Sequence, residues 1–103
     1  MADNIEEMYK RAREAFREVE SWPQEKADEM VAAAGWEWQK PETAKALARL
    51  AVDESGIGVY EDKVHKIGNK IRGTLRDSLG VQTCGLVKED KEKGLRIFAK
   101  PIG

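Results

Sequence analysis

The sequence predicts a four-helix segment followed by a β-hairpin, in a chain of 103 residues. Up to about residue 80, apolar residues recur at threes and fours in four separate stretches, which is the period of amphipathic helices. After Gly80 the pattern changes to two short runs typical of strands, separated by a polar loop that ends in glycine. We therefore divide the chain into a helical part, 1–80, and a hairpin part, 81–103.

The composition limits the class of protein. Charged residues make up 36% of the chain and apolar residues 41%, which fits a soluble globular chain and is too apolar for a typical disordered segment. No stretch of about 20 apolar residues is present, and the first residues lack the pattern of a secretory signal. A single cysteine and a single histidine argue against a disulfide framework and a zinc finger. We expect one small cytoplasmic domain with no bound metal and no membrane partner.

The first helix is predicted over 4–20. Asp3 and Glu6 have the spacing of a capping box, whose side chains accept hydrogen bonds from the free backbone N–H groups at a helix start. The apolar side chains that follow share one face: Ile5, Met8, Tyr9, Ala12, Phe16 and Val19. Such a helix most commonly packs on the core of its own protein. A helix that docks on a partner or directs the chain to a bacterial microcompartment is the alternative.

Prolines and glycines delimit the next three helices. Pro23 lies in the predicted first turn of the second helix and Pro41 begins the third, where a missing N–H costs nothing. Gly56 ends the third helix, and the fourth covers 59–79 and stops at Gly80. Short connections of this kind favour antiparallel neighbours. Two glycines inside the fourth helix, Gly68 and Gly73, predict a kink or early fraying.

The hairpin is predicted from strands over 81–87 and 95–100 with a loop over 89–94. A two-stranded hairpin alone is marginally stable in water and needs a sheet partner. The sequence offers no third strand and stops at Gly103 without a capping element or polar tail. We therefore expect the fold to continue in further sequence.

Neither Cys84 nor His65 is predicted to be catalytic. Cys84 lies inside a predicted strand with no adjacent group to lower its pKa, so a buried packing role is expected. His65 lies three residues after Asp62 and four before Asn69 on a polar helix face, so a solvated side chain is expected. The glycine pair in 56–58 lacks the third glycine and the preceding strand of a dinucleotide-binding fingerprint.

A basic face on the fourth helix supports a rival function, a small helical interaction module or a weak nucleic-acid binder. The cations on this face are Lys63, Lys66, Lys70, Arg72 and Arg76. No aromatic residue lies between Tyr60 and Phe98 to stack on bases, which weakens the case for single-strand recognition. A solvated helix face is the preferred interpretation, and we do not expect nucleic acid as a partner.

Three stretches resemble the CoA-acylating aldehyde dehydrogenases. Residues 46–64, ALARLAVDESGIGVYEDKV, resemble the family pattern LAxLAVxETGxGxxEDKV, with Ser55 where threonine is usual. Residues 23–28, PQEKAD, are similar to the sQExvD that starts the family's second helix. Residues 97–103, IFAKPIG, are similar to the xIAxPxG that leads into its nucleotide-binding domain. The resemblance covers nearly all of the chain.

Smaller elements refine the resemblance. TLRD at 74–77 and EKG at 92–94 look closest to the sulfoacetaldehyde-oxidising, acylating branch. KIGN at 66–69 departs from the family, which tends towards KN directly, and this leaves the local helix geometry open. The resemblance implies an α/β fold for the complete protein, in which 81–103 leads into a dinucleotide-binding domain.

The resemblance also implies an activity. A complete family member oxidises an aldehyde with NAD or NADP through a cysteine thiolate and passes the resulting thioester to coenzyme A. The nucleophile, the dinucleotide loops and the oxyanion asparagine belong to regions downstream of Gly103, so no residue of this chain is assigned a catalytic, cofactor-binding or metal-binding role. We expect neither cofactor to bind this chain alone.

The resemblance implies two partners, the remainder of the enzyme and a second subunit. Strands at the position of 81–100 resemble part of the sheet through which aldehyde dehydrogenase subunits associate. We therefore expect the hairpin to serve in a homo-oligomer, with Leu86, Ile97 or Phe98 facing the core. The cations expected to keep its loop and outer face soluble are Lys88, Lys91, Lys93 and Arg96.

Overall fold

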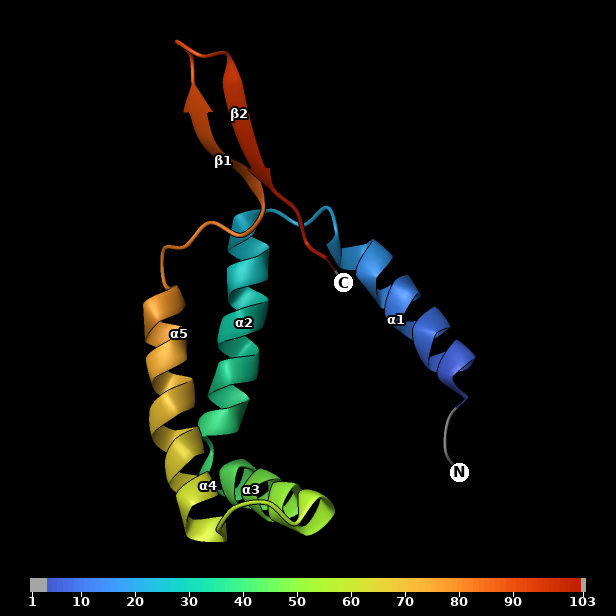
Figure 1. The fold of residues 1–103 in the computed structure, drawn as a ribbon, viewed down its shortest axis with the longest axis vertical. Helices are drawn as coiled ribbons and strands as arrows, with labels where there is room; N and C mark the ends of the chain where they lie inside the picture. Colours follow the sequence, from blue (N-terminus) through green and yellow to red (C-terminus); the bar gives the residue numbers. More distant parts are fainter. Residues whose placement is uncertain (1–3, 103) are drawn as a thin grey trace. The chain divides into compact units, whose positions relative to one another are not determined.

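The computed structural model describes residues 4–102 and confirms four helices followed by a hairpin (Figure 1). Helices α4 and α5 are joined without a break by the π-helical segment η1, so the three together are the predicted fourth helix. The elements are α1 (Ile5–Val19), α2 (Gln24–Gln39), α3 (Pro41–Ser55), α4 (Tyr60–Lys66), η1 (Ile67–Ile71), α5 (Arg72–Ser78), β1 (Gly85–Asp90) and β2 (Leu95–Ala99).

The described residues form two compact units. One contains the residues up to Asp28 together with those from Gln82 onwards, and the other is Glu29–Val81. The first unit therefore holds α1, the start of α2 and the hairpin. The second unit holds the rest of α2 and all of α3, α4, η1 and α5.

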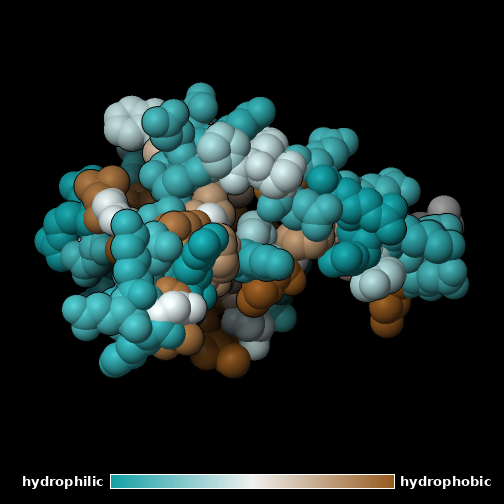
Figure 2. Space-filling view, turned by 90° about the horizontal axis from the view of Figure 1, so that it is seen from above, coloured by the Kyte–Doolittle hydropathy of each residue, from teal (hydrophilic) through white to brown (hydrophobic). Residues whose placement is uncertain are grey.

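Helix α1 is amphipathic, as predicted. Asn4 is its N-cap residue, and the Asn4 Oδ1 accepts a hydrogen bond of 3.1 Å from the backbone N–H of Glu6. Asp3, which the sequence indicated as part of the cap, lies outside the described residues. Among residues 4–102 nothing buries the apolar start of the helix, since Ile5 is 82% exposed and Tyr9 is also exposed. Figure 2 shows brown hydrophobic patches on the surface among teal hydrophilic residues.

The core of the second unit is small and depends on small side chains. Ala44 and Ala48, one turn apart on α3, are buried together with Ile67 of η1. Alanine at both positions allows the backbones of α3 and η1 to approach closely. Beside this cluster, the Arg49 guanidinium lies over the Tyr60 ring, 4.1 Å from its centre. Partly buried apolar residues pack around this cluster: Leu47, Tyr60, Val64 and Ile71.

Helix α2 meets α5 at a glycine. Gly35 is buried, and a Cβ atom built on it would lie 2.3 Å from the Cδ1 of Leu75. Any larger residue would therefore force the Leu75 side chain to move. Gly35 is therefore one of the points where the two helices come into contact within the second unit.

The fourth helix, in which Gly68 and Gly73 predicted a kink or early fraying, is not α-helical throughout, because Ile67–Ile71 forms a π-helix. A π turn shifts the hydrogen bond by one residue and disturbs the regular pairing of backbone carbonyls. The Gln39 Nε2 donates to the Ile67 carbonyl at 3.0 Å, and the Gln39 Oε1 accepts from the Arg72 Nε at 3.3 Å. The π turn overlaps the KIGN stretch that departs from the family pattern, and Gly68 lies within it.

The first strand begins later than predicted, at Gly85 instead of residue 81, and continues to Asp90. The backbone N–H groups of Thr83 and Cys84 donate to the Gln24 side chain and so cannot join a ladder. Gly85 itself has a φ of 81°, which sets the direction of the chain as it enters the strand. At the other end of β1, the turn between the two strands is closed by the Asp90 Oδ1, which accepts a hydrogen bond from the backbone N–H of Lys93 at 3.1 Å.

The strands pair antiparallel with a β-bulge between Leu86 and Lys88. Leu86 lies opposite Phe98, whereas Lys88 lies opposite Ile97. Neighbouring residues of one strand point to opposite faces, so Phe98 and Ile97 do not share a face. The hairpin therefore presents apolar side chains on both faces, and among residues 4–102 nothing buries Leu86, Ile97 or Phe98.

Substitution by alanine should change the stability of the second unit in opposite directions at Gly56 and at Gly73. Gly56 caps α3 with a φ of 65°, where a Cβ is strained, so Gly56→Ala should lower the free energy of unfolding of the second unit by about 1 kcal/mol. Gly73 is helical with open space around it, so Gly73→Ala should raise stability by up to about 1 kcal/mol. Urea titration followed by circular dichroism measures both. Equal effects from the two substitutions would contradict this account of Gly56.

The Glu37 carboxylate should titrate below its usual range. A hydrogen bond from the Lys40 ammonium, and then one from the Thr43 hydroxyl, lower the Glu37 pKa below 4.5. Because the pKa is lowered in the folded state, the contribution of Glu37 to stability is present above pH 4.5 and is lost as the pH falls through its folded value. NMR titration should show the Glu37 pKa rising in Lys40→Met and rising less in Thr43→Val. An unchanged Glu37 pKa in Lys40→Met would refute the assignment.

Candidate functional site

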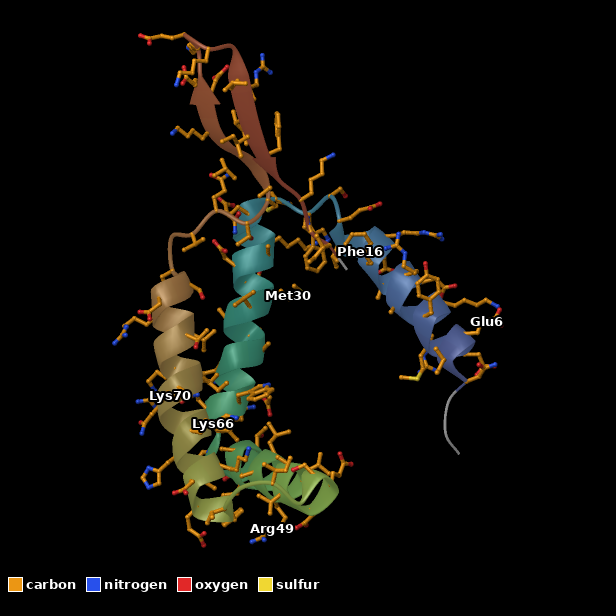
Figure 3. All side chains as sticks on the ribbon, in the orientation of Figure 1. Glu6, Phe16, Met30, Arg49, Lys66 and Lys70 are labelled. Atoms are coloured by element: carbon orange, nitrogen blue, oxygen red, sulfur yellow. The ribbon has the colours of Figure 1, made fainter. Side chains whose placement is uncertain are left out.

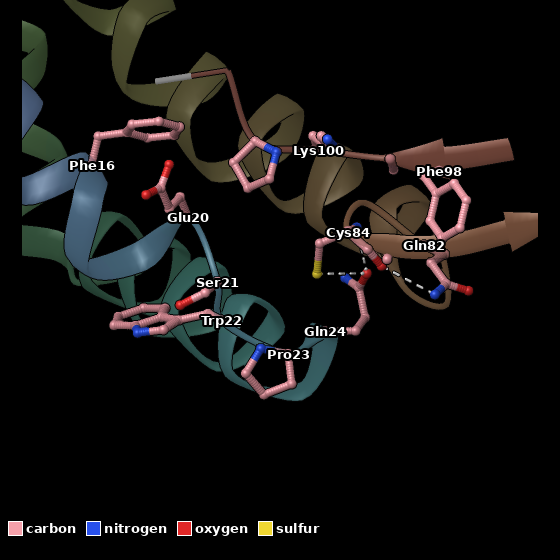
Figure 4. A pocket seen from close by; sticks show the side chains of 13 residues that line it. Phe16, Glu20, Ser21, Trp22, Pro23, Gln24, Gln82, Cys84, Phe98 and Lys100 are labelled. Atoms are coloured by element: carbon pink, nitrogen blue, oxygen red, sulfur yellow. Dashed lines mark hydrogen bonds between the residues drawn. The ribbon is translucent and has the colours of Figure 1, made fainter.

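The first unit contains a cavity of about 690 Å³ (Figure 4). The end of α1, the connection to α2, the segment before β1 and the end of β2 line it. Its wall combines three aromatic rings with several polar groups. The aromatic residues are Phe16, Trp22 and Phe98, and the residues with side-chain polar groups are Glu20, Ser21, Gln24, Gln82, Cys84 and Lys100.

Gln24 organises the polar side of this cavity. Its Oε1 accepts hydrogen bonds from the backbone N–H groups of Thr83 at 2.7 Å and Cys84 at 3.0 Å. Its Nε2 donates to the Thr83 Oγ1 at 2.9 Å and to the Asp28 Oδ1 at 2.8 Å. One carboxamide thus satisfies two consecutive backbone donors and uses both of its own donors, which leaves it no spare donor for a ligand.

Cys84 is buried, as predicted, at 8% exposure. It does not lie in a strand interior, however, but directly before β1, because its N–H is bonded to Gln24 and not to the ladder. Its Sγ lies 3.4 Å from the Gln24 Oε1, close enough for the thiol to donate a weak hydrogen bond. The Gln82 Nε2 donates to the Cys84 carbonyl at 3.1 Å, so the carboxamides of Gln24 and Gln82 together hold the residue through three hydrogen bonds. These contacts make it a packing and hydrogen-bonding residue.

His65 is exposed on α4, as its position on a polar helix face predicted. It lines an open depression with Asp62 and Asn69, the two residues that the spacing placed beside it, together with Lys66 and Lys70. Exposed side chains of mixed charge around the imidazole leave it solvated. The loop over 56–58 joins α3 to α4, so it lacks the strand that a dinucleotide fingerprint requires.

The basic face of the fourth helix is mostly solvated, as predicted, with Lys63 half-buried and the other four cations exposed. Lys66 and Lys70, both labelled in Figure 3, are exposed. Arg72 donates to Gln39, and Arg76 forms an exposed ion pair with Asp77 at 3.0 Å. Two of the five cations, Arg72 and Arg76, are therefore engaged within the chain.

Two kinds of feature are absent from residues 4–102. No helix there is both long and apolar enough to cross a lipid bilayer. No group of three or more histidine, cysteine, aspartate or glutamate side chains in the same range is arranged to hold a metal ion.

The geometry defines a helical segment with a hairpin, held by packing and amide hydrogen bonds. Comparison with known proteins indicates the class of enzyme that contains such a segment. No family model and no solved structure matches the chain significantly. Curated proteins do match, among them sulfoacetaldehyde and succinate-semialdehyde dehydrogenases, several of them named as acylating or acetylating, and aldehyde-alcohol dehydrogenases.

Three of these relatives each match more than nine-tenths of this chain. The chain is 38% identical over 94 residues to a sulfoacetaldehyde dehydrogenase of Acholeplasma sp, covering 91% of this chain and 19% of that protein. It is 36% identical over 99 residues to the acylating sulfoacetaldehyde dehydrogenase of Bilophila wadsworthia, covering 96% and 21%. It is 35% identical over 100 residues to the acetylating succinate-semialdehyde dehydrogenase of Clostridium kluyveri, covering 97% and 22%.

The chain therefore spans about a fifth of the length of the relatives it matches. The resemblance found in the motifs is confirmed, since the chain is similar over nearly its whole length to an N-terminal part of CoA-acylating aldehyde dehydrogenases. The structural role of Gln24 was missed at the sequence level. The available signal was its place in the PQEKAD stretch, but no local pattern links it to residues 59 and 60 positions further on.

Removing the Gln24 carboxamide should loosen the entry to the hairpin. Gln24→Leu leaves the N–H groups of Thr83 and Cys84 without this acceptor, and the loss of the part-buried bond to Cys84 should cost about 1–3 kcal/mol. Hydrogen exchange should show lost protection at both amides. Glu25→Leu, at the adjacent exposed position in the same helix turn, is the matched control and should leave them protected. Protected amides in Gln24→Leu would show that another group holds this segment.

Proposed function

We propose that this chain is the N-terminal part of a cytoplasmic, NAD- or NADP-dependent, CoA-acylating aldehyde dehydrogenase and is catalytically incomplete by itself. The supporting observation is the extent of the similarity, which covers 91–97% of this chain but only about a fifth of each of the three relatives described above. The complete enzyme converts an aldehyde, coenzyme A and NAD(P)⁺ to an acyl-CoA and NAD(P)H. The sulfoacetaldehyde dehydrogenases among the relatives favour the corresponding branch.

We infer that the described residues, 4–102, do not form a site for either cofactor. The Cys84 thiol is buried against an amide oxygen, with no base beside it in the described contacts. The glycines of 56–58 connect two helices, and the basic face is open to solvent. We therefore assign the thiolate, the dinucleotide site and the coenzyme A site to the remainder of the enzyme and derive no chemical step through this chain.

The role proposed for this chain is structural. Apolar residues on α1 and on both faces of the hairpin are exposed to water, which is thermodynamically unfavourable. We propose that the remainder of the enzyme covers them and supplies strands that pair with the hairpin edges, which are otherwise open. A second subunit would lie next to the same hairpin in a homo-oligomer.

The rival function, a helical interaction module or weak nucleic-acid binder, has less support. Two of the five cations on the basic face, Arg72 and Arg76, form contacts within the chain. The relatives are dehydrogenases. A steep loss of nucleic-acid affinity with rising salt, as counterion release requires, would favour the rival.

The decisive experiment is to read the coding region beyond Gly103 and to assay both products. We expect an open frame that continues into a glycine-rich α/β sequence. The longer product should reduce NAD(P)⁺ in the presence of an aldehyde and coenzyme A, and purified 1–103 should not. A stop codon directly after Gly103, or coenzyme-A-dependent NAD(P)H formation by 1–103 alone, would contradict the proposal.

The hairpin should be required for assembly of the complete enzyme. Phe98→Asp places a charge on an apolar face that we assign to an interface, so the subunit mass measured by light scattering should fall to that of a smaller assembly. Ile57→Asp, at an exposed loop position of the second unit, is the control and should leave the mass unchanged. Lost activity with an intact, folded oligomer in Phe98→Asp would show that the hairpin does not serve assembly.

A further inference from the structure

The second unit carries an apolar groove of about 290 Å³ that the proposed function leaves without a role. Ala48, which is fully buried, and Ile67, at 5% exposure, lie at its base. Trp38 from α2 and Leu50 from α3 line its sides and remain partly exposed. The groove thus combines a buried apolar base with an aromatic wall that water still reaches.

The charges at the groove are predominantly positive. Lys63 and Lys66, three positions apart on α4, both line it and therefore lie on the same side of that helix. Within residues 4–102 neither lysine forms an ion pair. Glu54 of α3 is the one acidic residue lining the groove, which leaves a net charge of one positive unit there. Two unpaired ammonium groups beside an apolar base favour a ligand that is apolar with one anionic end.

We propose that this groove binds a small amphiphilic carboxylate. Its aliphatic or aromatic part would cover Ala48 and Ile67 against Trp38, and its carboxylate would lie between Lys63 and Lys66. Burial of apolar surface supplies about 25 cal/mol per Å², and the charge pair mainly selects the sign of the head group. The volume is close to the lower end of about 300 Å³ for small-molecule sites, so the groove suits a short chain or one ring and not a nucleotide.

Two probes of equal chain length and opposite charge test the proposal on the purified chain. Octanoate should shift the NMR signal of the Trp38 indole N–H as it binds, and octylammonium should bind at least about threefold more weakly. Trp22, which lines the cavity of the first unit, reports binding elsewhere in the same spectrum. A shift at Trp22 in place of Trp38, equal binding of both probes, or no binding of octanoate would overturn the proposal.

Matched lysine variants separate the groove from general attraction to a basic face. Lys66→Gln should weaken octanoate binding about threefold, since a solvent-exposed ion pair contributes about 0.2–1 kcal/mol. Lys70→Gln removes an exposed lysine that does not line the groove and should leave the affinity unchanged. Equal weakening in both variants would overturn the proposal. The assay involves no aldehyde chemistry, so its failure is distinguishable from failure of the proposed enzyme function.

Discussion

The first unit depends on one carboxamide. Gln24 connects the start of α2 to the residues before β1, which are 59 and 60 positions away in sequence. Its oxygen takes two backbone donors that would otherwise be free, and a buried donor without an acceptor is costly. The position of Cys84, the first residue of β1 and the polar wall of the cavity all follow from this contact. A charged or apolar side chain of similar size would not supply both the acceptor and the donors.

The second unit is stabilised differently, by the close approach of helices at small residues. Alanines on α3 and Gly35 on α2 bring backbones together over a small buried area. Most large apolar side chains of the described chain remain exposed, including Trp36 at 72%. A chain of this length buries only about two thirds of its unfolded surface even when it is complete. This exposed apolar area is the observation behind the proposal that a larger protein covers the segment.

The sequence predicted those features of the fold that depend on local periodicity. The four helices follow from side-chain spacing. The start of α3 at Pro41 and its C-cap at Gly56 follow from the backbone preferences of proline and glycine. The π turn could not be predicted in this way, because its Ile67 carbonyl bonds to Gln39 from another helix. The predicted start of β1 was wrong for a similar reason. The backbone N–H groups of Thr83 and Cys84 bond to the distant Gln24 side chain and not to β2. Burial of Cys84 was predictable from its type, but its hydrogen-bond partner was not.

The bulge at Val87 determines which charges face each other across the hairpin. In a regular ladder continued from the pair of Leu86 and Phe98, Lys88 would lie opposite Arg96, and two like charges would repel. The extra residue advances the register by one, so that Arg96 meets Glu89, with the Arg96 Nε 3.4 Å from the Glu89 Oε1. Slippage of the strands would bring back the repulsion. The irregularity in the backbone thus makes the pairing of two short strands selective for a single alignment.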